Sequence, residues 1–284
     1  MSLRPRLRSV LFAPATRPDL AAKLARAAPD AAILDLEDAV PATHKEQARH
    51  QAVGLVAELA RRHRDLTVFV RVNAVGTAWF DADVEAVLST SAAGVVVPKV
   101  GSLADVARLS AVLSTCDRPL SVVAGIETAR GVAEVDSLLT PPVTACYFGA
   151  EDFVSDMGGR RTADGLETLY ARSRVALAAR VAEVDALDQV VVDFRNDAAF
   201  RADAAMGRAL GYPGKMCLHP GQVALANAVF SPTPEEVDRA ARLVAAHEAA
   251  TRAGVAAIDF EGVMVDEPLV SRAREILRWA TSGS

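Results

Sequence analysis

Short apolar runs alternate along this chain with longer amphipathic segments. Most of the runs are continuously apolar and rich in β-branched residues, instead of alternating between apolar and polar positions. This pattern is typical of parallel strands that are covered on both faces and joined by crossover helices. The eight predicted strands span residues 9–13, 32–36, 67–72, 94–98, 120–126, 143–148, 189–194 and 214–218.

Eight such units are the number that closes a barrel, whereas an open doubly wound sheet usually has fewer strands and a topological switch point. We therefore predict an α/β fold in which residues 1–230 form a (β/α)8 TIM barrel. One predicted crossover helix, residues 162–184, is expected to pack on the barrel through the apolar face that carries Leu166, Leu169, Tyr170, Leu177 and Val181.

Residues 231–284 follow the eighth unit and are predicted to form a C-terminal helical extension. Thr233 and Glu236 stand at the positions of a capping box, so a helix should begin at Pro234 and continue to about Ala253. Residues 259–266 form a short strand or loop before a last helix. The extension is a lid over the site or packs on a neighbouring subunit, and the periodicity fits both.

Bulk properties narrow the class of protein. The 284 residues are 51% apolar and 24% charged, which is the composition of a globular protein with a large core. The net charge of -5 is interspersed, so we expect no nucleic-acid binding, and no apolar run of about 18 residues predicts a membrane span. No secretion signal is evident, and three separated cysteines, predicted to be buried thiols, indicate a reducing cytoplasm.

Polar side chains gather where the predicted strands end, and in a barrel these ends meet at one mouth. Carboxylates from different strands, without a histidine pair at ligand spacing, suit a hard cation such as Mg²⁺. Glu127 and Asp152 are the candidate ligands, although ion pairs with basic neighbours are an alternative role. The strand-end residues are Asp35, Glu37, Asp38, Arg71, Asn73, Lys99, Glu127, Thr128, Glu151, Asp152, Asp193, Arg195, Asn196 and His219.

Other residues near the mouth have weaker signals. Arg71 lies in an apolar run and needs an anionic partner, which is either a carboxylate or a substrate oxygen. A lone histidine such as His219 is more often structural than catalytic. The turn of Gly149, Ala150 and Glu151 brings backbone amides to the mouth, where they could bind a substrate oxygen. Arg17 and Lys23 could meet phosphate or be solvated surface charges.

Eight motifs occur together and in order: RSVLFAPATRPD, AILDLEDAV, VFVRVN, GVVVPKV, GIETARG, YFGAEDF, GKMCLHPGQ and FEGVMVDEP. With them, nearly the whole chain resembles the citrate lyase beta-subunit-like proteins of the HpcH/HpaI aldolase/citrate lyase superfamily. Two positions depart from the family pattern. Asp19 stands where some relatives have lysine, and Ala15 replaces a frequent glycine.

The resemblance implies a magnesium-dependent carbon-carbon lyase, or a Claisen-type ligase in reverse, that acts on a malyl-CoA, citramalyl-CoA or citryl thioester. It implies metal binding by Glu127 and Asp152, substrate contact by Arg71, and acid-base catalysis by Asp266 from the tail of a neighbouring subunit in a homotrimer. The coenzyme A contacts that it implies are Phe12, Arg17, Lys23, Leu218 and His219, which moves His219 from a structural to a binding role.

Three alternatives remain open. A class II aldolase that releases pyruvate shares a barrel and acidic metal ligands, but it relies on a histidine base. A non-catalytic subunit of a larger complex could keep the barrel without turnover. The substrate could also be the thioester of an acyl carrier protein instead of coenzyme A.

Overall fold

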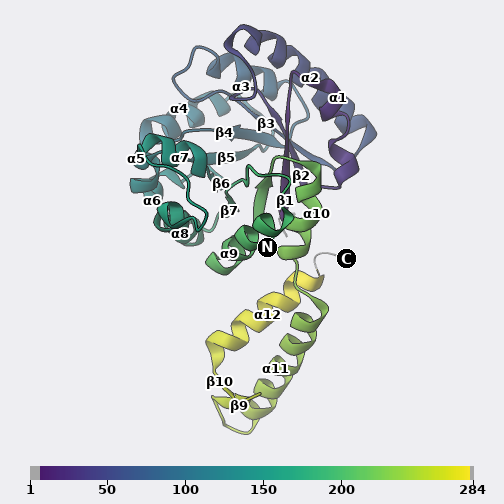
Figure 1. Cartoon of the computed structure of the whole chain (residues 1–284), viewed down its shortest axis with the longest axis vertical. Helices are drawn as coiled ribbons and strands as arrows, with labels where there is room; N and C mark the ends of the chain where they lie inside the picture. Colours follow the sequence, from purple (N-terminus) through teal and green to yellow (C-terminus); the bar gives the residue numbers. More distant parts are fainter. Residues whose placement is uncertain (1–6, 282–284) are drawn as a thin grey trace. The chain divides into compact units, whose positions relative to one another are not determined.

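The computed structural model describes residues 7–281, in which eight parallel strands close into a barrel surrounded by helices (Figure 1). The TIM-barrel prediction is therefore confirmed. Each strand pairs with the next along the chain, and β8 pairs with β1. The strands are β1 (Ser9–Pro14), β2 (Ala31–Asp35), β3 (Thr67–Arg71), β4 (Gly94–Val97), β5 (Ser121–Ile126), β6 (Ala145–Phe148), β7 (Asp185–Asp188) and β8 (Gly214–Cys217).

Burial on both sides of the strands explains their continuous apolar runs. Val10, Ile33, Phe69 and Met216 belong to one buried cluster to which every barrel strand contributes. Their sequence neighbours point to the other face because side chains alternate along a strand, and residues such as Leu11 are buried there as well. The predicted two-sided burial is thus present.

Strand β7 lies four residues earlier in the chain than the hydropathy predicted. The predicted run, residues 189–194, is a loop in which Val192 and Phe194 are exposed. The real strand contains Asp188, which is completely buried because Arg172 and Lys215 form ion pairs with it at 2.6 and 2.8 Å. These partners are distant in sequence, so local hydropathy could not reveal that a polar segment is a core strand.

The predicted apolar face of the crossover helix α8 (Leu166–Val181) was wrong. Leu166, Tyr170, Leu177 and Val181 are all exposed, each by more than half of its surface. The opposite side, with small residues such as Ala171 and Ala178, is buried instead. Small side chains let a helix approach the barrel closely, so the larger apolar residues are left on the outer surface.

The remaining helices have the following bounds: α1 (Pro18–Ala21), η1 (Leu24–Ala27), η2 (Ala42–His44), α2 (Lys45–Arg62), α3 (Phe80–Leu88), α4 (Leu103–Leu113), α5 (Ala129–Ala133), α6 (Val135–Leu138), α7 (Ala150–Asp156), α9 (Asp197–Leu210), α10 (Pro220–Val229), α11 (Pro234–Arg252) and α12 (Glu267–Thr281). In the part of the chain that the structure describes, none of the helices is long and apolar enough to span a membrane.

The chain divides into two compact units, and the second begins at Ala228. In this second unit the predicted capping box is confirmed, because Thr233 and Glu236 cap α11 reciprocally. Strands β9 (Ile258–Phe260) and β10 (Val263–Val265) form an antiparallel hairpin between α11 and α12. The unit has its own apolar cluster, which includes Leu243 and Val270. Of the cysteines, Cys146 and Cys217 are buried, but Cys116 is only half-buried.

Candidate active site

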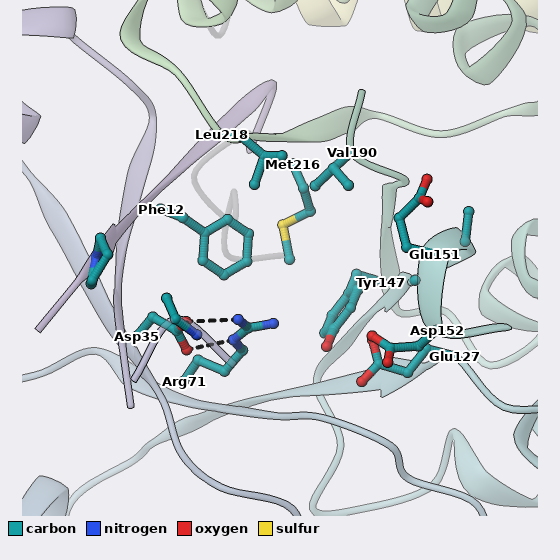
Figure 2. A pocket seen from close by; sticks show the side chains of 14 residues that line it. Phe12, Asp35, Arg71, Glu127, Tyr147, Glu151, Asp152, Val190, Met216 and Leu218 are labelled. Carbon is teal, nitrogen blue, oxygen red and sulfur yellow. Dashed lines mark hydrogen bonds and ion pairs between the residues drawn. The ribbon is translucent and has the colours of Figure 1, made fainter. Parts of the chain in front are cut away.

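A cavity of about 280 Å³ lies at the carboxyl ends of the barrel strands, where the sequence placed the site. Figure 2 shows it with an apolar wall on one side and charged side chains on the other. Arg71 and both predicted metal carboxylates face it together. The lining residues are Phe12, Pro14, Asp35, Ala39, Arg71, Glu127, Tyr147, Gly149, Ala150, Glu151, Asp152, Val190, Met216 and Leu218.

Arg71 is held in place by its neighbours on β1 and β2. The strand register puts Asp35 directly opposite Arg71, and the two side chains form a bidentate ion pair with N···O distances of 2.6 and 2.7 Å. A second carboxylate, Glu37, lies 3.1 Å away, and the guanidinium carbon lies 4.9 Å from the centre of the Phe12 ring. The required anionic partner is therefore Asp35, and the guanidinium still reaches the cavity.

Glu127 directly follows β5 and is almost completely buried. Its Oε1 accepts a hydrogen bond from the backbone N–H of Lys99 at 2.8 Å. Burial, together with the negative charge of Asp152, raises the pKa of Glu127 to about 7. A Cβ on residue 149 would lie 2.2 Å from Glu127 Oε2, so the glycine at this position leaves room for the carboxylate.

Tyr147 is a site residue that the sequence reasoning missed. It lies on β6, and its buried phenol lies beside the Glu127 carboxylate (Figure 2), without a hydrogen bond of ordinary geometry. Gly125 makes room for it, since a Cβ there would lie 2.5 Å from the phenol oxygen. The available signal was a polar aromatic residue two positions before Gly149 in a continuously apolar strand.

Asp152 and Glu151 come from the first turn of α7, directly after β6. Glu151 pairs with Arg161 at 3.0 Å, whereas Asp152 lies 3.6 Å from the ammonium of Lys99. Lys99 also pairs with Glu37, and thus connects the Arg71 side of the cavity with the Glu127 side.

The arrangement fits a magnesium ion held by few protein ligands. Within residues 7–281, no group of three or more His, Cys, Asp or Glu side chains is arranged to hold a metal ion. Magnesium commonly takes only one or two carboxylates, with water and substrate as its other ligands. Burial and the negative charge of Asp152 raise the pKa of Glu127, and a divalent cation would stabilise the ionised form of such a carboxylate. The carboxylates of Glu127 and Asp152 therefore fit a magnesium site with two protein ligands.

The rim beside Leu218 is formed by the loops that follow β7 and β8. Buried Gln222 connects them, because its side chain accepts from the N–H groups of Leu218 and His219 and donates to Val191 O at 2.8 Å. The exposed His219 ring stacks on Phe194 with 5.1 Å between the ring centres. The sequence analysis placed residues 189–194 in a strand, so it did not identify Phe194 as a residue of the rim.

Other predicted site residues are not among the residues that line the cavity. Arg17 forms an ion pair of 2.8 Å with exposed Asp19, and Lys23 is exposed next to η1. Asp193 and Arg195 lie in the loop after β7, while Asn196 caps α9 by accepting from Ala199 N–H. Asp266 belongs to the second unit, at the residue before α12.

The chain is a TIM-barrel protein with Arg71, Glu127 and Asp152 at the carboxyl ends of its strands, and comparison with known proteins identifies the family. The sequence model of the HpcH/HpaI aldolase/citrate lyase family matches residues 8–220. A citrate lyase subunit beta-like protein of Deinococcus radiodurans is 50% identical, over 95% of this chain and 96% of the relative. The human mitochondrial citramalyl-CoA lyase is 30% identical, over 97% and 86% of the two chains.

The structural comparison agrees. CitE of Mycobacterium tuberculosis, solved in complex with magnesium, acetoacetate and coenzyme A, superimposes with a TM-score of 0.83 and 33% identity. The match covers 98% of this chain and all of CitE. The chain belongs to the HpcH/HpaI aldolase/citrate lyase family of carbon-carbon lyases.

Proposed function

We propose that this enzyme is a magnesium-dependent lyase that cleaves a 3-hydroxyacyl-CoA, such as malyl-CoA or citramalyl-CoA, into an acyl-CoA and a 2-oxo acid. The observation that carries the proposal is the meeting of Arg71, Glu127 and Asp152 at one cavity. Related proteins point the same way, because CitE was solved with magnesium and coenzyme A and the human relative is a citramalyl-CoA lyase.

Glu127 and Asp152 would hold the magnesium ion, which supplies Lewis-acid polarisation of the oxo-acid oxygens. Arg71 would stabilise the negative charge that develops on the substrate oxygen, because its guanidinium is fixed and permanently charged. Gly149 lines the cavity, but its N–H donates to Ile126 O at 3.2 Å, so the backbone amides of Ala150 and Glu151 would orient the substrate. In cleavage the hydroxyl proton passes to solvent at the mouth, and the O–H electron pair forms the carbonyl group of the 2-oxo acid. The carbon-carbon bond breaks at the same time, and its electron pair goes to the thioester enolate.

Asp266 would deliver the proton that this enolate carbon needs, or remove it in the reverse direction. The residue would come from a neighbouring subunit of a homotrimer. At the rim, Phe12, Leu218 and His219 would contact the coenzyme A part, with Arg17 and Lys23 near its phosphates. The pair between Arg17 and Asp19 weakens the phosphate role of Arg17, since its charge is already balanced.

Turnover by the purified chain tests the proposal. Malyl-CoA and citramalyl-CoA are offered separately, with magnesium and with EDTA, and both the 2-oxo acid and the acyl-CoA are quantified. We expect magnesium-dependent cleavage of at least one of them. Activity only on a carrier-protein thioester would change the substrate class, and inactivity on all of these substrates would contradict the proposal.

The aldolase alternative is disfavoured by the site. No histidine is among the described residues that line the cavity, and His219 lies on the rim. An aldolase of that class needs a histidine base. Release of pyruvate from a long hydroxy-oxo acid without coenzyme A would restore that alternative.

A further inference from the structure

Lys99 has an unusual backbone. It follows β4, and its φ of 55° lies in the left-handed region, which residues other than glycine rarely adopt. In this conformation the Lys99 N–H points at Glu127 Oε1, at 2.8 Å. Strained backbone at a cavity is often retained because it positions a functional group.

The side chain of Lys99 reaches the other predicted metal ligand. Its ammonium pairs with Glu37 and also lies 3.4 Å from Asp38 and 3.6 Å from Asp152. One residue therefore contacts Glu127 through its backbone and Asp152 through its side chain. The ammonium remains charged, because the pairing with Glu37 outweighs burial and raises the pKa of Lys99.

This ammonium has opposite effects on the site with and without metal. Without metal, it balances part of the negative charge of neighbouring carboxylates. With a divalent cation on Asp152, two positive charges would share one carboxylate, and their repulsion lowers the affinity. Arg71, the other basic side chain near the carboxylates, is less free than Lys99 to move toward Asp152, because Asp35 holds it in a bidentate pair.

We propose that Lys99 is a positioning residue that organises the metal-free carboxylates and limits magnesium affinity by competing with the ion for Asp152. The inference rests on the proposed function through its metal ligands. A moderate intrinsic affinity would make magnesium binding depend on the anionic substrate, whose oxygens complete the coordination shell.

Calorimetric titration with magnesium alone, without any substrate, tests this role. Lys99→Met removes the charge but keeps the backbone N–H, and we expect magnesium to bind roughly tenfold more tightly. Lys99→Arg keeps the charge and should bind like the wild type. Arg130→Met removes a positive charge from an exposed pair with Glu134 and should leave the affinity unchanged. Unchanged or weaker magnesium binding by Lys99→Met overturns the proposal.

Lys99→Gly guards against misfolding of the methionine variant. Glycine accepts a positive φ, so this variant keeps the N–H to Glu127, relieves the backbone strain and should show the same gain in affinity. If the wild type binds and uses magnesium but neither variant binds it more tightly, only the role of Lys99 fails. If the wild type binds no magnesium, the metal assignment fails, and the role of Lys99 with it.

Discussion

At the scale of single residues, the site depends on one glycine and one buried carboxylate. Gly149 lies so close to Glu127 that the two positions form one unit. The motif GAED shows a glycine at this place, but only the structure shows that it is needed for the side chain of another strand end.

Gly149→Ala is therefore predicted to displace the Glu127 carboxylate. We expect magnesium affinity to fall at least about tenfold and turnover about a hundredfold, because small displacements at a reacting centre have large effects. Gly54→Ala is the control, since Gly54 is exposed in α2 with no heavy atom within 4 Å of an added Cβ. It should keep full activity and gain about 0.5–1 kcal/mol of stability. Equal magnesium binding by the two variants would contradict the prediction.

The raised pKa of Glu127 predicts how magnesium binding depends on pH. In the metal-free protein this carboxyl is protonated below pH about 7, and the ion must displace the proton. Affinity should therefore fall about tenfold per pH unit below that value and level off above it. The folded state also holds this proton more strongly than the unfolded state. The free energy of unfolding of the metal-free protein should therefore decrease as the pH rises from 4.5 to about 7.

Titrations and thermal melts between pH 5 and 9 would measure both effects. Glu127→Gln should lose magnesium binding and should also lose this part of the pH dependence of stability. A wild-type affinity that does not change with pH would show that Glu127 is not a ligand.

At the scale of elements, hydropathy located most strands but not the long-range side-chain contacts that stabilise them. It found seven barrel strands within about two residues, because two-sided burial makes them continuously apolar. It failed at β7, where the stabilising ion pairs of Asp188 are long-range. It also failed at α8, whose buried face combines small residues with the ion-paired Arg172. Which face of an amphipathic helix is covered depends on its neighbours in space.

Gln222 connects two elements, so its loss should loosen the rim. Gln222→Ala removes the acceptor for Leu218 N–H and His219 N–H and the donor to Val191 O. We expect KM for the coenzyme A thioester to rise about tenfold while kcat changes little, because the cavity carboxylates lie on other strands. KM for the matching N-acetylcysteamine thioester, which lacks the nucleotide, should stay the same. An equal rise for both substrates would refute a rim effect.

At the scale of the whole molecule, the proposed mechanism needs residues from two units. The first unit contains the cavity, and the second contains Asp266. The proposed homotrimer joins them by supplying Asp266 from a neighbouring subunit, which a mass measurement in solution and a complementation experiment can test.

Asp266→Asn should keep magnesium binding but lose turnover, and Glu127→Gln should lose both. If Asp266 acts across subunits, co-expression of these two inactive chains will produce mixed oligomers with part of the wild-type activity. Each variant purified alone provides the control. Complete inactivity of proven mixed oligomers would show that Asp266 does not act across subunits.

Hydropathy and motif order were enough to predict the barrel, the family and the strand ends that supply Arg71, Glu127 and Asp152. These features depend on apolar runs and on motifs, both of which are formed by residues that are neighbours in the sequence. The tertiary structure alone decided that Asp35 holds Arg71, that Tyr147 faces Glu127, and that Lys99 contacts both carboxylates. These contacts join residues from different strands, and their closeness arises only when the sheet closes and its register is set.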